Sequence, residues 1–159
     1  METYTHSAII RTPFGKLAIY AEENHLLALR YVPASIALKA PIHDLLIETH
    51  RQLQLYFDQP NYHFHLPLKP QGSVFQQRVW HAISAIGVGQ TQTYGALAHH
   101  LDSSVRAIGQ ACGTNPFPLI IPCHRVVAAN GLGGFAQTST KSYLLEIKRW
   151  LLMHEQQHT

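Results

Sequence analysis

The stretch TYGALAHHLDSSVRAIGQACG, residues 93–113, contains two short helical patterns separated by a polar break. The first pattern ends near Leu101, the residues "DSS" follow, and the second pattern begins at Val105. Two short helices joined by about three polar residues predict a helix-turn-helix. Such helix pairs also occur in proteins that never bind DNA, so a binding function needs evidence from further residues.

The second helical pattern has two different faces. Helical periodicity places four residues on a face that we predict to pack inward: Val105, Ile108, Ala111 and Cys112. The opposite face carries small or short side chains and one long cation: Ser103, Arg106, Ala107 and Gln110. A slim helix with a single arginine suits a narrow DNA groove, where an inserted side chain can displace a base. A plain surface helix is the alternative interpretation.

An apolar run follows this region and ends in "IIPCHRVV", which places Cys123 beside His124. We predict a strand that terminates at Cys123. A thiol next to an imidazole can act as a nucleophile, because a nearby base raises the thiolate fraction. The alternative is an inert buried cysteine, which is common. Cys112 is explained as a core residue, and the sequence positions no second thiol near Cys123.

Composition limits the class of protein. The chain has 159 residues, of which 46% are hydrophobic and 13% charged, which is typical of folded domains. The segment "LPLKPQGS" predicts a linker, so we expect an N-terminal domain over 1–70 and a C-terminal domain over 71–159. The net charge of +3 permits a nucleic-acid partner without requiring one. No run is apolar enough to cross a membrane, and two cysteines form no disulfide framework, so we expect a cytoplasmic protein with reduced thiols.

The N-terminal half shows no catalytic constellation. "SAIIRTPFGKLAIYAEENHLLALRYV" predicts three strands connected by the turns "TPFG" and "EENH". A helix follows in "IHDLLIETHRQLQLYFDQP", with one apolar stripe: Leu46, Thr49, Leu53, Tyr56 and Phe57. The chain has twelve histidines, but they lack the paired spacing of zinc ligands, so we expect no metal site.

Several motifs occur in one order across the second half: "FQQRVW", "TYGALA", "RAIGQACGTNP", "IIPCHRVV" and "WLLMHE". In sequence and separation they resemble the O6-alkylguanine-DNA alkyltransferases, also called methylated-DNA-protein-cysteine methyltransferases. The resemblance covers about residues 73 to 155, and the first half resembles the family's first domain more loosely. It implies an α/β, ribonuclease H-like N-terminal domain and a mostly helical C-terminal domain with a winged helix-turn-helix-like motif.

The resemblance also implies a reaction. A cysteine thiolate takes an alkyl group, such as methyl, from O6 of guanine in double-stranded DNA and keeps it, so each chain works once. O4-alkylthymine is a second lesion that the resemblance leaves open. The family acts as a monomer through the minor groove, with no cofactor and no obligate protein partner.

The resemblance also implies roles for individual residues of this chain. Cys123 matches the acceptor, His124 the histidine that takes the thiol proton through a bound water, and Glu155 the carboxylate that orients this histidine. Arg106 matches the arginine that replaces the flipped nucleotide, and Tyr94 the tyrosine that assists flipping and donates to guanine. The remaining matches are Asn115, which braces the turn, and the pocket residues Pro118, Val126 and Phe135.

One departure concerns the segment behind Phe135, where the chain has about five extra residues near Gln137 to Ser142 relative to many family members. The width of the alkyl pocket therefore does not follow from the sequence. A cysteine hydrolase would use the same Cys/His chemistry, but it needs water to release its intermediate. A lesion-binding module without repair activity would lack the acceptor cysteine, which is present here as Cys123.

Overall fold

The computed structural model describes residues 5–133 and 142–156. The chain divides into two compact units, Met1–Pro70 and Gln71–Thr159. The division falls inside the proline-containing segment predicted as a linker. No helix in the described parts of either unit is long and apolar enough to cross a bilayer.

The first unit contains an antiparallel sheet of three strands in the order β1-β2-β3. These are β1 (His6–Thr12), β2 (Gly15–Ala21) and β3 (Leu26–Val32), which confirms the predicted meander. Thr12 pairs with Gly15 across the first turn, and Gly15 has a φ of +139°, a conformation that favours glycine.

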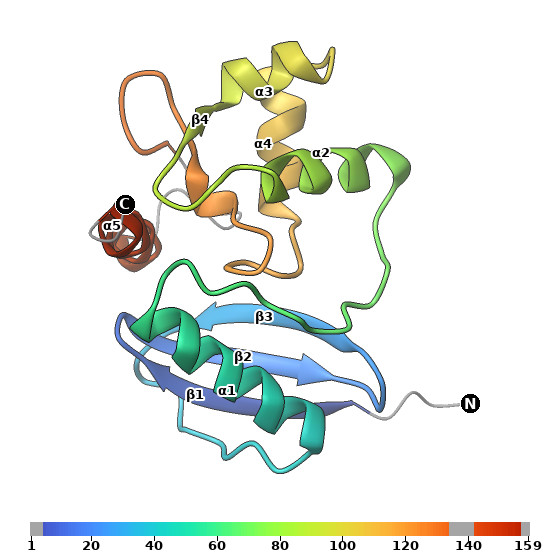
Figure 1. The fold of residues 1–159 in the computed structure, drawn as a ribbon, viewed down its shortest axis with the longest axis vertical. Coiled ribbons are helices and arrows are strands. Elements are labelled where there is room, and N and C mark those ends of the chain that lie inside the picture. Colours follow the sequence, from blue (N-terminus) through green and yellow to red (C-terminus); the bar gives the residue numbers. More distant parts are fainter. Residues whose placement is uncertain (1–4, 134–141, 157–159) are drawn as a thin grey trace. The chain divides into compact units, whose positions relative to one another are not determined.

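Helix α1 (Asp44–Asp58) packs on β1 and β2 and crosses one face of the sheet (Figure 1). The predicted apolar stripe is buried, and Gln52 is buried with it. The Gln52 side chain accepts from the backbone N–H of His65 at 2.8 Å and donates to the His65 carbonyl at 3.0 Å. This pair of hydrogen bonds satisfies the buried amide and fixes the chain that follows the helix.

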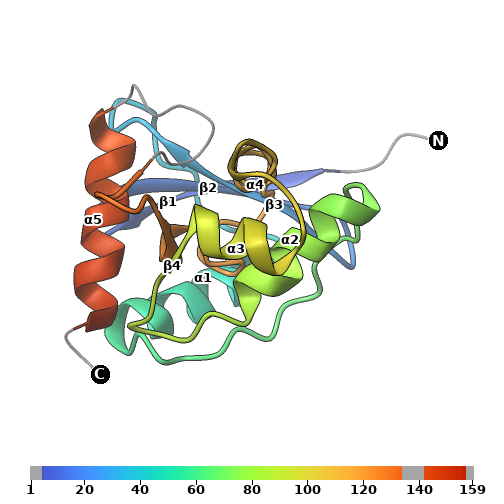
Figure 2. The same cartoon turned by 90° about the horizontal axis from the view of Figure 1, so that it is seen from above.

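The second unit is mostly helical (Figure 2). Its elements are α2 (Val74–Ser84), β4 (Gln92–Thr93), α3 (Tyr94–His100), α4 (Val105–Gly113), the single 3-10 turn η1 (Cys123–Arg125), β5 (Val126–Val127) and α5 (Ser142–Gln156). Helix α2 begins with a reciprocal capping box formed by the Ser73 side chain and Gln76. The two short helices α3 and α4 are present as predicted, on either side of the break at Asp102–Ser104.

A short parallel pairing decides where the chemistry-bearing residues meet. Gln92 pairs with Val126, and Thr93 pairs with Val127. The start of α3 therefore lies beside the segment that directly follows Cys123. Helix α5 packs against η1, and Glu155 in its last turn is hydrogen bonded to His124 in η1.

Candidate active site

The segment before Cys123 is a loop, and the predicted strand is wrong. Leu119 has a φ of +77°, which is unusual for a side chain with a Cβ, and Cys123 opens the 3-10 turn η1. Pro118 and Pro122 explain the difference, because neither offers an N–H to a strand ladder. Leu119 and Asp102 are the two residues other than glycine with a positive φ among the described residues.

The Asn115 side chain ties this loop together. Its carbonyl accepts from the Phe117 N–H at 2.9 Å. Its amide donates to the Ile121 carbonyl at 2.9 Å and to Cys123 Sγ at 3.1 Å. One amide thus connects the end of α4, the loop and the thiol.

The Cys123 thiol is 6% exposed and packs among apolar residues of α2, α3 and α4. Sγ donates to the Cys112 carbonyl at 3.8 Å, which places the two cysteines side by side. Cys112, which the sequence explains as a core residue, is half-buried and lies beside Cys123. The Cys112 hydrogen bond and burial both raise the pKa of Cys123, whereas the Asn115 amide lowers it.

His124 and Glu155 form a buried pair. The distance from His124 Nε2 to Glu155 Oε2 is 2.8 Å, and the two side chains are 0% and 1% exposed. Arg125 joins them: its Nε donates to Oε1 at 2.9 Å, its Nη2 to Oε2 at 3.0 Å, and its Nη1 to the Ile86 carbonyl at 2.6 Å. Our sequence interpretation gave Arg125 no role, although it follows His124 directly in "PCHRV".

These contacts fix the protonation of the pair. Burial alone would raise the pKa of Glu155, but hydrogen bonds from His124 and Arg125 outweigh it and hold this pKa well below its usual range. Burial lowers the pKa of His124 despite the carboxylate, so the imidazole is neutral near pH 7. An ionised Glu155 accepts the Nε2 proton, which leaves Nδ1 as the basic nitrogen. Nδ1 is buried and has no hydrogen-bond partner among the described residues.

Lys148 is a second residue that the sequence interpretation missed. Its side chain is fully buried, and Nζ donates to the Val126 carbonyl at 2.8 Å. Nζ also lies 5.8 Å from the centroid of the Tyr94 ring. Burial lowers the pKa of Lys148 to about 8, while the Cys112 and Cys123 thiols favour its charged form. The only sequence signal was a lysine on the apolar face of the last helical pattern.

Tyr94 is the first residue of α3, directly after the capping Thr93. Burial raises the pKa of its phenol, so the hydroxyl stays protonated and can donate a hydrogen bond. Gly133 packs tightly against this ring: a Cβ there would lie 2.9 Å from Tyr94 Cε2. Pro118 is half-buried and Val126 fully buried, whereas Phe135 and the extra residues up to 141 lie outside the described residues.

The inward face of α4 is partly as predicted. Ile108 and Ala111 are buried, but Val105 is 55% exposed, so its expected place in the core is wrong. The helix begins at Val105 after the capping Ser104, and the first turn of a helix often projects beyond the core that later turns contact. Ser103 consequently precedes the helix.

Four residues make up the outer surface of α4: Arg106, Ala107, Gly109 and Gln110. Arg106, Gly109 and Gln110 are exposed, and Ala107 is half-buried. A Cβ added to Gly109 would meet no atom within 4 Å. The fold therefore does not require glycine at this position, although glycine inside a helix costs about 0.5–1 kcal/mol relative to alanine.

Two domain models of one protein family match this chain. Residues 5–70 match the ribonuclease-like domain of 6-O-methylguanine DNA methyltransferase, and residues 74–157 match the DNA-binding domain of the same family. The chain belongs to the 6-O-methylguanine DNA methyltransferase family. It combines an N-terminal sheet domain with a helical C-terminal DNA-binding domain, as other members do.

Similar members of the family span nearly the whole chain. A methylated-DNA–protein-cysteine methyltransferase of Methanosarcina acetivorans is 34% identical, covering 93% of this chain and 96% of its own. The constitutive enzyme of that name from Bacillus subtilis is 37% identical over 87% and 92% of the two chains. The crystal structure of Mycobacterium tuberculosis OGT in complex with DNA has a TM-score of 0.80 at 33% identity, covering 97% of this chain and 94% of that one.

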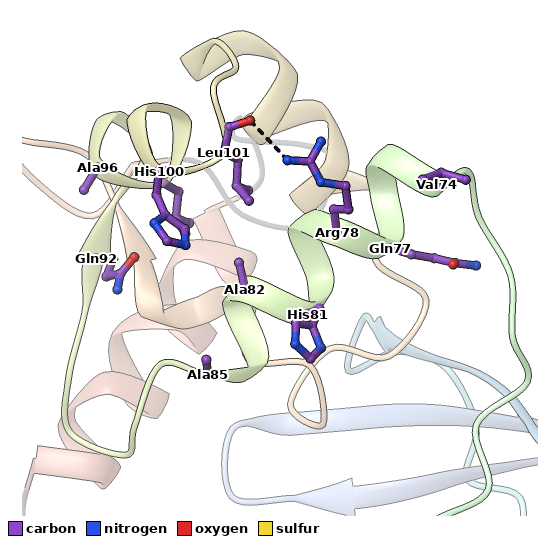
Figure 3. Close-up of a pocket in the computed structure, with 11 residues that line it drawn as sticks. Val74, Gln77, Arg78, His81, Ala82, Ala85, Gln92, Ala96, His100 and Leu101 are labelled. Atoms are coloured by element: carbon purple, nitrogen blue, oxygen red, sulfur yellow. Dashed lines mark hydrogen bonds between the residues drawn. The ribbon is translucent and has the colours of Figure 1, made fainter.

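A groove between α2 and α3 contains none of the predicted site residues of this family member (Figure 3). Its lining includes three basic or titratable side chains, Arg78, His81 and His100, and no carboxylate. Arg78 donates to the Leu101 carbonyl at 3.4 Å, as the dashed line in Figure 3 shows. Arg78 therefore offers an exposed cation in the same unit as Arg106 but on different elements.

The first unit contains one group with metal-ligand chemistry among its described residues: His6, Glu23 and His43. The two imidazole rings stack at 4.0 Å, and each Nε2 contacts the Glu23 carboxylate, at 3.0 and 3.4 Å. His43 Nδ1 also accepts from the Leu45 N–H, which caps α1. An imidazole that accepts at Nδ1 keeps its proton on Nε2 and offers no lone pair there, so these contacts need no metal. The absence of a metal site stays a prediction.

Proposed function

We propose that this chain repairs DNA by direct reversal, as a methylated-DNA–protein-cysteine S-methyltransferase that moves an alkyl group from O6 of guanine to Cys123. One observation carries the proposal: a buried thiol directly precedes a buried histidine whose Nε2 is bound to an ionised Glu155 and whose Nδ1 is left as a base. Family membership and relatives of that name support the same reaction.

The reaction divides among few residues. His124 Nδ1 takes the Cys123 proton through a bound water, and the Asn115 amide stabilises the sulfur as charge develops. The thiolate attacks the alkyl carbon, so an S–C bond forms as the C–O6 bond breaks. The guanine leaving group develops negative charge as this bond breaks, and a hydrogen bond from the Tyr94 hydroxyl stabilises that charge. A thioether is no leaving group for water, so the transfer occurs once per chain.

The site needs its base because the thiol is difficult to ionise. The Cys112 hydrogen bond and burial raise the pKa of Cys123, so little thiolate exists at pH 7 without a proton acceptor. The neutral His124 supplies this acceptor, and Glu155 stabilises the imidazolium that results. Arg125 holds Glu155 in place with two hydrogen bonds and acts as a positioning residue.

DNA binds, in this proposal, through the outer surface of α4 in the minor groove. The absent side chain at Gly109 lets the helix backbone approach the groove closely, and Ala107 and Gln110 add little bulk. Arg106 enters the duplex and fills the space left by the flipped guanine, while Tyr94 and Ser103 contact the strand beside it. The helix pair α3–α4 then acts as a winged helix-turn-helix-like motif, and the N-terminal domain has a ribonuclease H-like fold.

The guanine pocket is formed by Tyr94, Pro118 and the backbone of Val126. The Lys148 contact fixes the Val126 carbonyl, and Pro118 directly precedes Leu119, whose φ is positive. Phe135 belongs to this pocket in our proposal, although it lies outside the described residues.

The role of Arg106 can be tested with two substrates. We expect Arg106→Ala to slow repair of a methylated duplex about tenfold or more, because extrusion of a base costs a few kcal/mol. Reaction with free O6-benzylguanine needs no extrusion and should keep its rate. Arg78→Ala is the matched control, since it removes the same charge from the groove in Figure 3. Equal slowing by both variants on duplex DNA would show that Arg106 contributes only a general positive charge.

A further inference from the structure

The two cysteines of the chain lie together, although eleven positions separate them in sequence. Cys123 Sγ donates to the Cys112 carbonyl at 3.8 Å, and Cys112 packs against the apolar cluster of α2, α3 and α4 that contains Cys123. Nothing in alkyl transfer requires a second thiol at this place. A pair of adjacent thiols is, however, the arrangement from which a disulfide forms.

We propose that Cys112 and Cys123 form a reversible intramolecular disulfide under hydroperoxide stress, which masks the alkyl acceptor. The inference rests on the proposed function for its consequence, because masking matters only if Cys123 accepts the alkyl group. The disulfide itself depends only on the contact between the two residues.

The oxidation begins at Cys112. The hydrogen bond from Cys123 lowers the pKa of Cys112, burial opposes this effect, and the Lys148 cation adds to the lowering. Cys112 is also half-buried, whereas Cys123 is 6% exposed. Cys112 is thus the more accessible thiol of the pair, and the Lys148 cation favours its ionised form.

The step balances with a hydroperoxide as the oxidant. The Cys112 thiolate attacks the terminal peroxide oxygen, so an S–O bond forms, the O–O bond breaks, and an alcohol leaves after taking a proton. Cys123 sulfur then attacks the sulfenic sulfur of Cys112; the S–S bond forms, the S–O bond breaks, and hydroxide leaves with the Cys123 proton as water. Two thiols are oxidised and one hydroperoxide is reduced. A dithiol reductant restores both thiols by exchange.

The test treats the full chain with one equivalent of hydrogen peroxide and reads the product by mass. We expect an intact monomer that has lost two hydrogens and a non-reduced peptide digest in which the Cys112 and Cys123 peptides are joined. Dithiothreitol should restore two free thiols. A joined species between two chains, or stable oxygen addition at Cys123 without a joined peptide, would overturn the proposal.

A second readout uses alkyl acceptance and two variants. The oxidised wild-type chain should lose most of its capacity to accept methyl from a methylated duplex and regain it with dithiothreitol. Cys112→Ser and Cys112→Ala should keep most of their own untreated capacity after the same dose, because they cannot form the disulfide. Reversible loss in the variants equal to that of the wild type would overturn the assignment of Cys112. If the chain accepts no alkyl group at all, the mass readout still decides whether the disulfide forms.

Discussion

Glu155→Gln should destabilise the second unit strongly, although it only replaces one carboxylate oxygen by an amide nitrogen. The Glu155 carboxylate is 1% exposed and accepts from His124 once and from Arg125 twice, at 2.8 to 3.0 Å. A neutral amide removes the counterion of Arg125, which is itself largely buried. The amide NH2 group also presents a donor where the carboxylate presented an acceptor.

The size of the effect follows from this burial. Removing one partner of a buried ion pair costs about 3–5 kcal/mol, because the other charge stays buried without compensation. At about 2–4 °C per kcal/mol for a chain of this size, the midpoint of thermal unfolding should fall by roughly 6–20 °C. Glu146→Gln is the matched control on the same helix. Glu146 is 68% exposed and paired with Arg149 near the surface, where such pairs contribute about 0–1 kcal/mol.

The assay is thermal unfolding of the wild type and both variants over a range of pH. The pKa of Glu155 is lower in the folded chain than its ordinary value of 4.5. The stability that depends on its charge is therefore fully present above about pH 4.5 and is lost as the pH falls through the folded pKa. The difference between wild type and Glu155→Gln should shrink in acid. A Glu155→Gln midpoint equal to that of Glu146→Gln at pH 7 would refute the buried-pair reasoning.

Two further residues give predictions of different kinds. Gly109→Ala should raise the free energy of unfolding by about 0.5–1 kcal/mol in thermal unfolding, because the added Cβ meets no atom of the fold. The same variant should bind duplex DNA more weakly. Unchanged DNA affinity would contradict close approach of α4 to the groove. Lys148→Met should move the pH dependence of the repair rate to higher pH, because the cation that favours ionisation of Cys123 is gone. A uniform loss of rate with an unmoved pH profile would make Lys148 purely structural.

Local patterns predicted the elements well because their signals are local. The three predicted strands are present, and the stripe from Leu46 to Phe57 is buried on the sheet. The strand predicted before Cys123 failed because two prolines override the apolar run. The predicted burial of Val105 is wrong because periodicity assigns a residue to a face but does not say where along the helix the core begins.

The site was predictable only where a motif contained it. Cys123 and His124 stand out as neighbours in the sequence, but Glu155 came from the family resemblance alone, and its contact with His124 spans 31 positions. The Cys112–Cys123 contact depends on the loop that Asn115 braces, and the burial of Lys148 depends on how α5 packs beside η1 and β5. No periodicity in the chain encodes those tertiary contacts.

The central claim is a single alkyl transfer to Cys123, and a titration measures it directly. A known amount of protein is titrated with methylated duplex DNA, without added thiol, and the product is digested for peptide mapping. We predict one methyl group per chain, carried by the peptide that contains Cys123, with the Cys112 peptide unmodified. Continued repair beyond one equivalent, as a hydrolytic enzyme would give, or a methyl group on any other residue would contradict the account.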